Sequence, residues 1–257
     1  MLARELISLH EKPREVAPFS ERYAGLTAQA GYDAALALHE HRLSLGWRAV
    51  GRKIGFTNRT LWQRYGVYEP MWGMVYDRTL IRAPHNHARV ALGDLVNPRI
   101  EPEICFALSA PPGERPLREC IAWMAHSIEI VQCHHPQWKV RIADCTTDNG
   151  LHGRLIVGPP APLPDDAVAR LPVVEVELYR GDALIDRGVG ANVLGSPLEA
   201  LAHLAELLAK QPAAPPLAAG EIITTGVITD AHPVAVGERW STRISGLPLA
   251  ALTLEFA

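Results

Sequence analysis

A short apolar stretch, residues 98–108 (PRIEPEICFAL), constrains the fold most, because it has the composition of a buried strand yet carries two acids. Successive side chains of a strand point to opposite faces, so Glu101 and Glu103 share one face. The large apolar residues of the stretch are expected to pack the strand into a hydrophobic core. Two carboxylates on one face of an apolar strand are costly unless their charges are compensated. A hard divalent cation compensates both, since Mg²⁺, Mn²⁺ and Ca²⁺ prefer oxygen ligands. The alternative is an edge strand with two solvated glutamates on its outer face.

Two further charged residues stand in apolar surroundings. Lys53 lies in the middle of residues 49–56 (AVGRKIGF), which have the pattern of a strand closed by glycine. Glu129 is flanked by two isoleucines, Ile128 and Ile130. A lysine in such a strand either meets a buried partner or extends its flexible side chain to water, and the segment alone leaves both possibilities open.

The composition indicates an ordinary globular chain. Its 257 residues are enough for one large core, or a core with a small appended lobe, and 48% are hydrophobic and 21% charged. The net charge of −3 and the scattered basic residues argue against a nucleic-acid-binding surface. The four cysteines form no CxxC pair and no zinc-like spacing.

The chain shows no sign of a membrane or secretory segment. No apolar run approaches the roughly 18 residues that a membrane span requires. The first residues are rich in charge and lack the apolar region of a secretory signal. We therefore expect a cytoplasmic protein with no membrane partner.

The order of patterns predicts an α+β fold. Helical patterns occur early, above all at residues 27–45 with Gly46 as a C-cap, while strand patterns predominate after residue 90. A hairpin is expected at residues 173–184, and Ser196-Pro197 is a typical helix start. We divide the chain into a helical N-terminal part with the Lys53 strand (residues 1–75) and a β-rich, metal-binding catalytic core (residues 76–257), together one compact unit.

Five ordered motifs resemble the 2-keto-4-pentenoate hydratase/4-oxalocrotonate decarboxylase family of the fumarylacetoacetate hydrolase superfamily. They are residues 51–58 (GRKIGFTN), 98–108 (PRIEPEICFAL), 127–149 (SIEIVQ…WK…D…DN), 190–208 (GANVLGSPLEALAHLAELL) and 220–226 (GEIITTG). The resemblance covers the chain from about residue 45 to its end. It implies a distorted mixed β-barrel or roll with flanking helices, a divalent metal, usually Mg²⁺ or Mn²⁺, and a homo-oligomer.

The resemblance also assigns residues. The acidic metal ligands of the family correspond to Glu101, Glu103 and Glu129, its lysine to Lys53, and an acid at the end of an aromatic loop to Asp77. Family members approach the substrate in segments that here contain Asp148 and Thr225, and Lys139 is a second candidate cation, ranked behind Lys53 because of the apolar neighbours of Lys53.

The chemistry of these residue types supports the assignment. Three carboxylates leave coordination positions open, where a 2-oxo acid can replace two waters through its carboxylate and keto oxygens. The metal then acts as a Lewis acid toward the enolate. Lys53 would hold the substrate carboxylate or stabilise the enolate charge, and Asp77 or a nearby group would move the proton or orient water.

Several positions depart from the family. Residues 132–135 (QCHH) replace an acid-Ser-Arg run, Gly150-Leu151-His152 replace an alanine and two serines, and Asn58 replaces serine. The new histidines, His134, His135 and His152, are either substrate contacts and acid/base groups or hydrogen-bonded residues with a structural role.

The leading hypothesis is a lyase that hydrates a 2-hydroxy-2,4-dienoate to a 4-hydroxy-2-oxo acid in aromatic catabolism. The second is decarboxylation of a 2-oxo-enedioate, which needs another cation at the distal end of the pocket, such as Arg52, Arg59 or Arg64. The third is C–C hydrolysis of an acylpyruvate. A non-catalytic partner subunit is a further possibility, but a scaffold has no need to keep three acids and a lysine in apolar segments.

Overall fold

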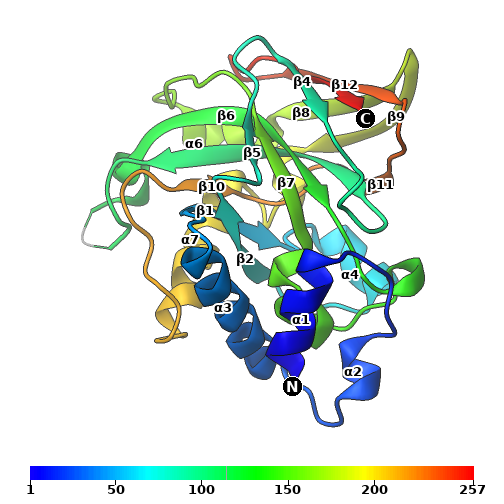
Figure 1. Cartoon of the computed structure of the whole chain (residues 1–257). Helices are drawn as coiled ribbons and strands as arrows, with labels where there is room; N and C mark the ends of the chain where they lie inside the picture. The colour runs from blue at the N-terminus through cyan, green and yellow to red at the C-terminus, as the bar shows by residue number, and fades with distance from the viewer. Residues whose placement is uncertain (114) are drawn as a thin grey trace.

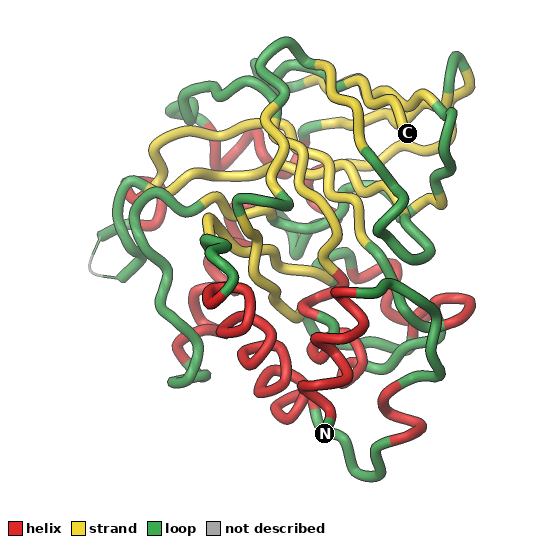
Figure 2. Tube along the Cα trace, viewed as in Figure 1, coloured by secondary structure: helices red, strands yellow, loops and turns green. Residues whose placement is uncertain are grey.

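The computed structural model describes residues 1–113 and 115–257, which form two packed β-sheets with helices gathered beside one of them (Figures 1 and 2). The first three helices, α1 (Leu2–Glu11), α2 (Phe19–Arg22) and α3 (Ala28–Ser44), precede every strand. The remaining helices are α4 (Trp62–Tyr65), α5 (Ile142–Thr147), α6 (Ala167–Arg170) and α7 (Pro197–Ala209).

The larger sheet has the strand order β2-β1-β10-β5-β6-β7-β3, with β11 paired to the outer end of β5. It curls over the helical part of the chain (Figure 1). Its strands are β1 (Ala49–Gly55), β2 (Met71–Tyr76), β3 (Leu80–Arg82), β5 (Arg99–Leu108), β6 (Ile121–Val131), β7 (His152–Val157), β10 (Ile222–Thr224) and β11 (His232–Pro233). β1 and β10 run parallel although about 170 residues separate them, and this pairing places Lys53 opposite Thr224.

The smaller sheet has the order β4-β13-β12-β8-β9 and carries the C-terminus. Its strands are β4 (His87–Val90), β8 (Glu175–Arg180), β9 (Ala183–Val189), β12 (Arg239–Ser245) and β13 (Thr253–Phe256). β8 and β9 form the hairpin that the sequence predicts.

Local sequence explains where the long helices begin and end. The Thr27 hydroxyl accepts a hydrogen bond from the Ala30 amide at the start of α3, and Gly46 follows the helix with φ +77°. Ser196 caps α7 by accepting from the Leu198 amide, and Pro197 occupies the first helical position.

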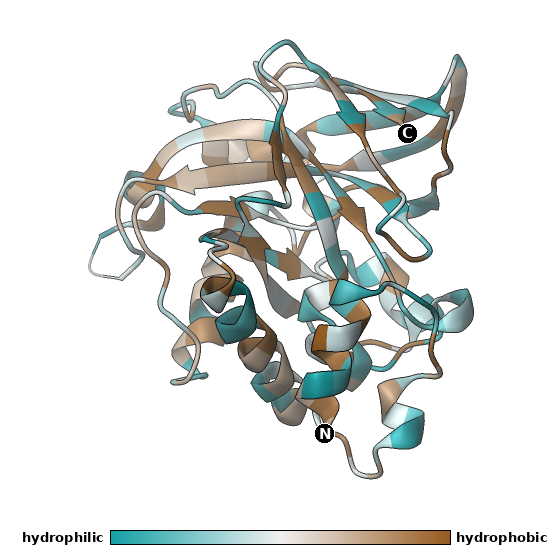
Figure 3. Ribbon diagram, in the orientation of Figure 1, coloured by the Kyte–Doolittle hydropathy of each residue, from teal (hydrophilic) through white to brown (hydrophobic). Residues whose placement is uncertain are grey.

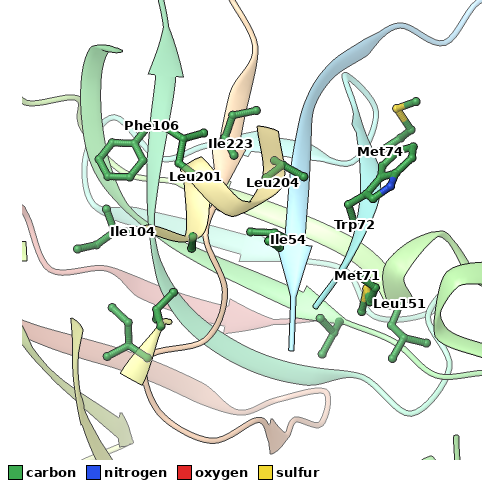
Figure 4. Close-up of a cluster of buried hydrophobic side chains, with 14 of the residues drawn as sticks. Ile54, Met71, Trp72, Met74, Ile104, Phe106, Leu151, Leu201, Leu204 and Ile223 are labelled. Carbon is green, nitrogen blue, oxygen red and sulfur yellow. The ribbon is translucent and has the colours of Figure 1, made fainter. Parts of the chain in front are cut away.

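The core lies between α7 and the larger sheet. Leu201 and Leu204 of α7 belong to the same buried cluster as Ile54, Ile104 and Ile223 of three neighbouring strands (Figure 4). Brown apolar residues also line the strands and the inward sides of the helices (Figure 3).

A second core joins the two sheets. Ile100 of β5 and Ile128 and Ile130 of β6 are buried with Trp240 and Leu254 of the smaller sheet. Because side chains alternate along a strand, the residues between these isoleucines face away from the smaller sheet. The acids lie on that opposite face.

The α+β prediction is confirmed, as is the curled mixed sheet with flanking helices. The division at residue 75 stays a prediction; β1 and β2 pair within the same sheet as β5, so the sheet extends across it. Within residues 1–113 and 115–257, no helix combines the length and apolar character needed to cross a membrane.

His126 is a buried polar link between the two sheets. Its Nδ1 donates to the Glu103 carbonyl at 2.9 Å, and its Nε2 lies 2.8 Å from the Thr242 hydroxyl of β12. This arrangement holds a neutral imidazole, and burial lowers the pKa of His126 to about 4 from its ordinary 6.5.

Acid should therefore weaken the fold through His126. Between pH 6.5 and 4 the unfolded chain binds a proton at this position and the folded chain does not, so the free energy of unfolding falls as the pH falls, by about 3 kcal/mol in total. Chemical denaturation across this range checks the expectation. His126→Gln should reduce the dependence on pH, and an unchanged dependence in that variant would contradict it.

Candidate active site

Strand register brings three acids together, of which Glu103 and Glu129 are buried and Glu101 is partly exposed. Glu101 of β5 lies directly opposite Glu129 of β6, and Glu103 is two residues further along β5 on the same face. One carboxylate oxygen of each acid lies within 4.8 Å of the others. The sequence predicted the shared face of Glu101 and Glu103, and the register adds Glu129.

Glu103 is fixed by the segment that follows β10. Its Oε2 accepts hydrogen bonds from the Thr224 hydroxyl and, at 2.9 Å, from the Gly226 amide. Gly226 has φ +102°, and a Cβ at this position would lie 1.8 Å from Thr57 Oγ1, so only glycine fits. The other oxygen of Glu103 is buried and has no hydrogen-bond partner among the described residues.

Glu129 is held between two cationic or polar side chains. Its Oε2 lies 3.1 Å from Lys53 Nζ, and its Oε1 lies 2.8 Å from His152 Nδ1. Lys53 is only 2% exposed and also donates to the Gly150 carbonyl at 2.8 Å. Gly150 has φ +67°, which glycine adopts readily, and a Cβ there would lie 2.9 Å from Lys53 Cδ.

Charge in the cluster is unbalanced. Burial acts to lower the pKa of Lys53, but the attraction of Glu129, Glu101 and Glu103 outweighs it and raises the pKa, so the lysine is a cation. Burial raises the pKa of Glu101 to about 7 and, more strongly, that of Glu103. For Glu129, Lys53 and His152 outweigh burial and lower the pKa. One lysine cannot neutralise three ionised carboxylates.

The residues present fit a divalent cation. They offer three carboxylates from two adjacent strands, a buried oxygen of Glu103 without a partner among the described residues, and more acidic groups than one lysine balances when all three are ionised. Hard cations such as Mg²⁺ take oxygen ligands of this kind and keep further positions for water or substrate.

A pocket opens beside the cluster. Its charged lining consists of Lys53 and Glu101, within the described part of the chain. The other lining residues are largely apolar and comprise Gly55, Phe56, Asn58, Leu61, Tyr65, Met71, Val131, Trp138, Leu151, Val227 and Ala231.

Three large wall residues have left-handed backbone conformations. They are Phe56 (φ 54°), Trp138 (φ 58°) and Leu151 (φ 62°). Bulky residues rarely adopt positive φ, and such strain persists only where surrounding packing determines it. The backbone therefore fixes the direction from which these three side chains enter the pocket.

Asp77 and Lys139 lie outside this pocket. Asp77 follows β2 and pairs with Arg48, whose amide and guanidinium donate to its two oxygens at 3.1 and 3.0 Å. These hydrogen bonds lower the pKa of Asp77. Lys139 is largely exposed and pairs with Glu21 at 3.3 Å.

Asp148 and Thr225 are buried close to the site, and both side chains are hydrogen-bonded to other parts of the chain. Asp148 accepts from His10 Nε2 at 2.9 Å and from His134 Nδ1 at 2.7 Å, which ties α1 to the loop before Gly150. The Thr225 hydroxyl donates to the Ile104 carbonyl at 2.7 Å. Its neighbour Thr224 makes the contact with Glu103. Thr224 lies opposite Lys53 in the pairing of β10 with β1, so alternation along β10 could have identified Thr224, rather than Thr225, as the site residue.

The departures from the family resolve into different roles. His134 and His135 are buried and hydrogen-bonded, His135 through Nδ1 to the Val16 carbonyl. Asn58 lines the pocket but donates to the Thr229 carbonyl at 3.1 Å. His152 alone among these histidines contacts a member of the acid cluster, and its Nε2 lies 2.9 Å from the Thr79 hydroxyl.

His152 is expected to orient Glu129. A partner that fixes a metal-ligating group typically contributes about 10–100-fold in metal affinity. His152→Ala should weaken Mg²⁺ binding by that factor, and calorimetric titration measures it. His152→Gln, which keeps a donor, should recover part of the loss, and Mg²⁺ affinity that is unaffected by either variant would contradict this role.

Comparison with known proteins agrees with the geometry. The fumarylacetoacetate (FAA) hydrolase C-terminal family matches residues 68–254. The chain belongs to the fumarylacetoacetate hydrolase family. The resemblance found in the sequence is thereby confirmed.

Similar proteins include a hydratase and a decarboxylase. The chain is 32% identical over 244 residues to 2-keto-4-pentenoate hydratase 1 of Dechloromonas aromatica (strain RCB), covering 91% of this chain and 88% of the relative. It is 28% identical over 247 residues to 4-oxalocrotonate decarboxylase of Pseudomonas sp. (strain CF600), covering 94% and 89%.

A solved structure has the same fold. The 4-oxalocrotonate decarboxylase from Pseudomonas putida G7, complexed with magnesium and adipate, superposes with a TM-score of 0.89 at 26% identity, covering 100% of this chain and 96% of that one. The prediction of a metal-dependent hydratase or decarboxylase agrees with these relatives.

Proposed function

We propose that this protein is a divalent-metal-dependent hydratase that converts a 2-hydroxy-2,4-dienoate of apolar tail into a 4-hydroxy-2-oxo acid, as in the catabolism of aromatic compounds. One observation carries the choice: in the pocket beside Glu101, Glu103 and Glu129 the charged lining residues are Lys53 and Glu101, and the rest of the described wall is largely apolar. Such a pocket suits a substrate with one carboxylate and a hydrocarbon tail.

Glu101, Glu103 and Glu129 would hold the cation, with Mg²⁺ or Mn²⁺ as the candidates. Magnesium in the related decarboxylase structure supports this choice. When bound, the cation supplies Lewis acidity that stabilises negative charge developing on a 2-oxo acid.

Lys53 provides the second positive charge. Its ammonium is anchored by the Gly150 carbonyl and Glu129, yet it lines the pocket, so it is placed to hold the carboxylate or the developing oxyanion of the substrate. As a cation it orients and stabilises rather than removing a proton.

The apolar wall contributes by excluding water. Leu151, Met71 and Val131 line the pocket with side chains that form no hydrogen bonds. In a site with little water, each charge interaction with the substrate is stronger than in solution.

Decarboxylation of a 2-oxo-enedioate is the second candidate, favoured by the likeness to 4-oxalocrotonate decarboxylase. It needs a cation for the distal carboxylate. Arg52 is buried against Glu221, and Arg64 pairs with Asp230. Neither of these arginines, nor Arg59, lines the described pocket, so hydration of a substrate with one carboxylate fits better.

A direct comparison of the two substrates tests the proposal. Purified protein with Mg²⁺ should hydrate 2-hydroxypenta-2,4-dienoate, and the loss of dienol absorbance measures this reaction. Its kcat/KM should be about 10–100-fold above that for CO₂ release from 4-oxalocrotonate, because the pocket leaves the distal carboxylate of 4-oxalocrotonate unpaired. Dominant CO₂ release would favour the decarboxylase. Bound metal without turnover of either would favour a non-catalytic partner subunit.

The proposal includes a homo-oligomer in the cytoplasm, for which the family resemblance is the support. Light scattering of the purified chain tests the oligomeric state, and a mass equal to one subunit would remove it from the proposal.

A further inference from the structure

The pocket wall separates the interior of the pocket from Arg99, an arginine with no acidic partner in the described part of the chain. Arg99 occupies β5 two residues before Glu101, so its side chain starts from the face that carries the acids, about 7 Å further out. Among the described residues no carboxylate oxygen lies within ion-pair distance of Arg99. Its contacts are the Tyr65 hydroxyl, to which Nη1 donates at 2.7 Å, and the Trp138 ring, whose centroid lies 4.4 Å from the guanidinium carbon.

Tyr65 and Trp138 line two hollows at once. Both belong to the wall of the apolar pocket that holds Lys53 and Glu101. Both also line a neighbouring surface hollow together with Arg64, Arg99 and Lys139. The two aromatic side chains therefore stand between a largely apolar cavity and a basic one.

The two flanking cations of that hollow are paired with acids, whereas Arg99 has no such partner within residues 1–113 and 115–257. Arg64 pairs with Asp230, and Lys139 pairs with Glu21. A guanidinium without a carboxylate partner is suited to bidentate binding of a carboxylate or a similar anion.

Trp138 is held rigidly in this position. Its indole nitrogen donates to the Asn97 carbonyl at 3.0 Å, its backbone has φ 58°, and it is 9% exposed. Moving the ring aside would break the indole hydrogen bond and the stacking on Arg99 together.

We propose that Trp138, with Tyr65, determines substrate class by screening Arg99 from the pocket, so that the enzyme takes 2-oxo acids with one carboxylate and rejects dicarboxylates of equal length. This inference rests on the proposed function. Removal of the screen makes Arg99 available to a distal carboxylate and converts the pocket to one that accepts a dicarboxylate.

Two 2-oxo acids of the same length test the screen without turnover. Binding of 2-oxohexanoate and 2-oxoadipate, which differ by the distal carboxylate, is measured calorimetrically with saturating Mg²⁺. The wild type should prefer 2-oxohexanoate by about 10-fold or more, because the pocket leaves the second carboxylate unpaired. Trp138→Gly, which suits the positive φ, should shift the ratio toward 2-oxoadipate by about 10–100-fold.

Matched variants separate the screen from general damage. Trp138→Phe keeps an aromatic wall and should keep the wild-type preference. Trp138→Gly combined with Arg99→Met should lose the gain for 2-oxoadipate. If Trp138→Gly does not fold, Tyr65→Ala opens the other half of the wall and should shift the ratio in the same direction.

The outcomes are distinct. If the wild type prefers 2-oxoadipate, or if the double variant keeps the gain in 2-oxoadipate binding without Arg99, the proposed screening role of Trp138 is wrong. Neither result bears on the metal site or on Lys53. Absence of Mg²⁺-dependent binding of either acid to the wild type overturns the proposed function, and this inference with it.

Discussion

Glu103→Gln is expected to abolish Mg²⁺-dependent activity and to weaken metal binding by more than about 100-fold, beyond the 10–100-fold typical of residues that only orient ligands. The side chain keeps its shape, and the amide oxygen can still accept from Thr224 and Gly226. What is lost is one of three negative charges, and the buried oxygen without a partner becomes an amide nitrogen.

Thermal unfolding separates this loss from misfolding. In the absence of metal the variant should melt no lower than the wild type, because repulsion from Glu129 and Glu101 is relieved. Added Mg²⁺ should raise the melting temperature of the wild type and leave that of the variant unchanged. Glu206→Gln, at an exposed position of α7, is the matched control and should behave as the wild type. Full Mg²⁺ stabilisation of Glu103→Gln would contradict its role as a ligand.

Lys53→Met is expected to lower kcat/KM by about 10²–10⁴-fold, the usual range for a positioned charge or proton-transfer group. Metal affinity should be retained or increased, since the methionine removes a cation that lies 3.1 Å from Glu129. The metal-free variant should be less stable, by about 3–5 kcal/mol, because the buried carboxylates lose their only lysine partner.

The two effects of Lys53→Met provide an internal check. Mg²⁺ should restore much of the lost stability and little of the lost activity, and urea unfolding with and without Mg²⁺ measures the first. Lys210→Met, an exposed lysine at the end of α7, is the control. If Lys53→Met loses metal binding instead, the lysine belongs to the metal site and not to the substrate site.

The sequence predicted the cluster of acids well because strand geometry is regular. Alternation along β5 places Glu101 and Glu103 on one face, and the isoleucines on either side of Glu129 mark it as an acid in apolar surroundings. The register that sets Glu129 opposite Glu101 depends on tertiary pairing, and the family resemblance supplied that acid.

The pocket wall and the partners of Asp77 and Asp148 could not be predicted, because they depend on irregular backbone and on distant parts of the chain. Trp138 and Leu151 enter the pocket from left-handed positions that no local pattern indicates. Asp77 turns toward Arg48 at the end of β2, and Asp148 is taken up by His10 and His134. In each case the partner lies far along the chain, so the residue type alone gave no direction.

A crystal of this protein grown with Mn²⁺ tests the account most directly, because anomalous scattering locates that ion without reference to activity. We predict one strong peak per chain, about 2.0–2.3 Å from a carboxylate oxygen of each of Glu101, Glu103 and Glu129, with Lys53 beside it. A peak at His10, His134 and Asp148 instead, or three acids that bind no ion at saturating Mn²⁺, would contradict the account.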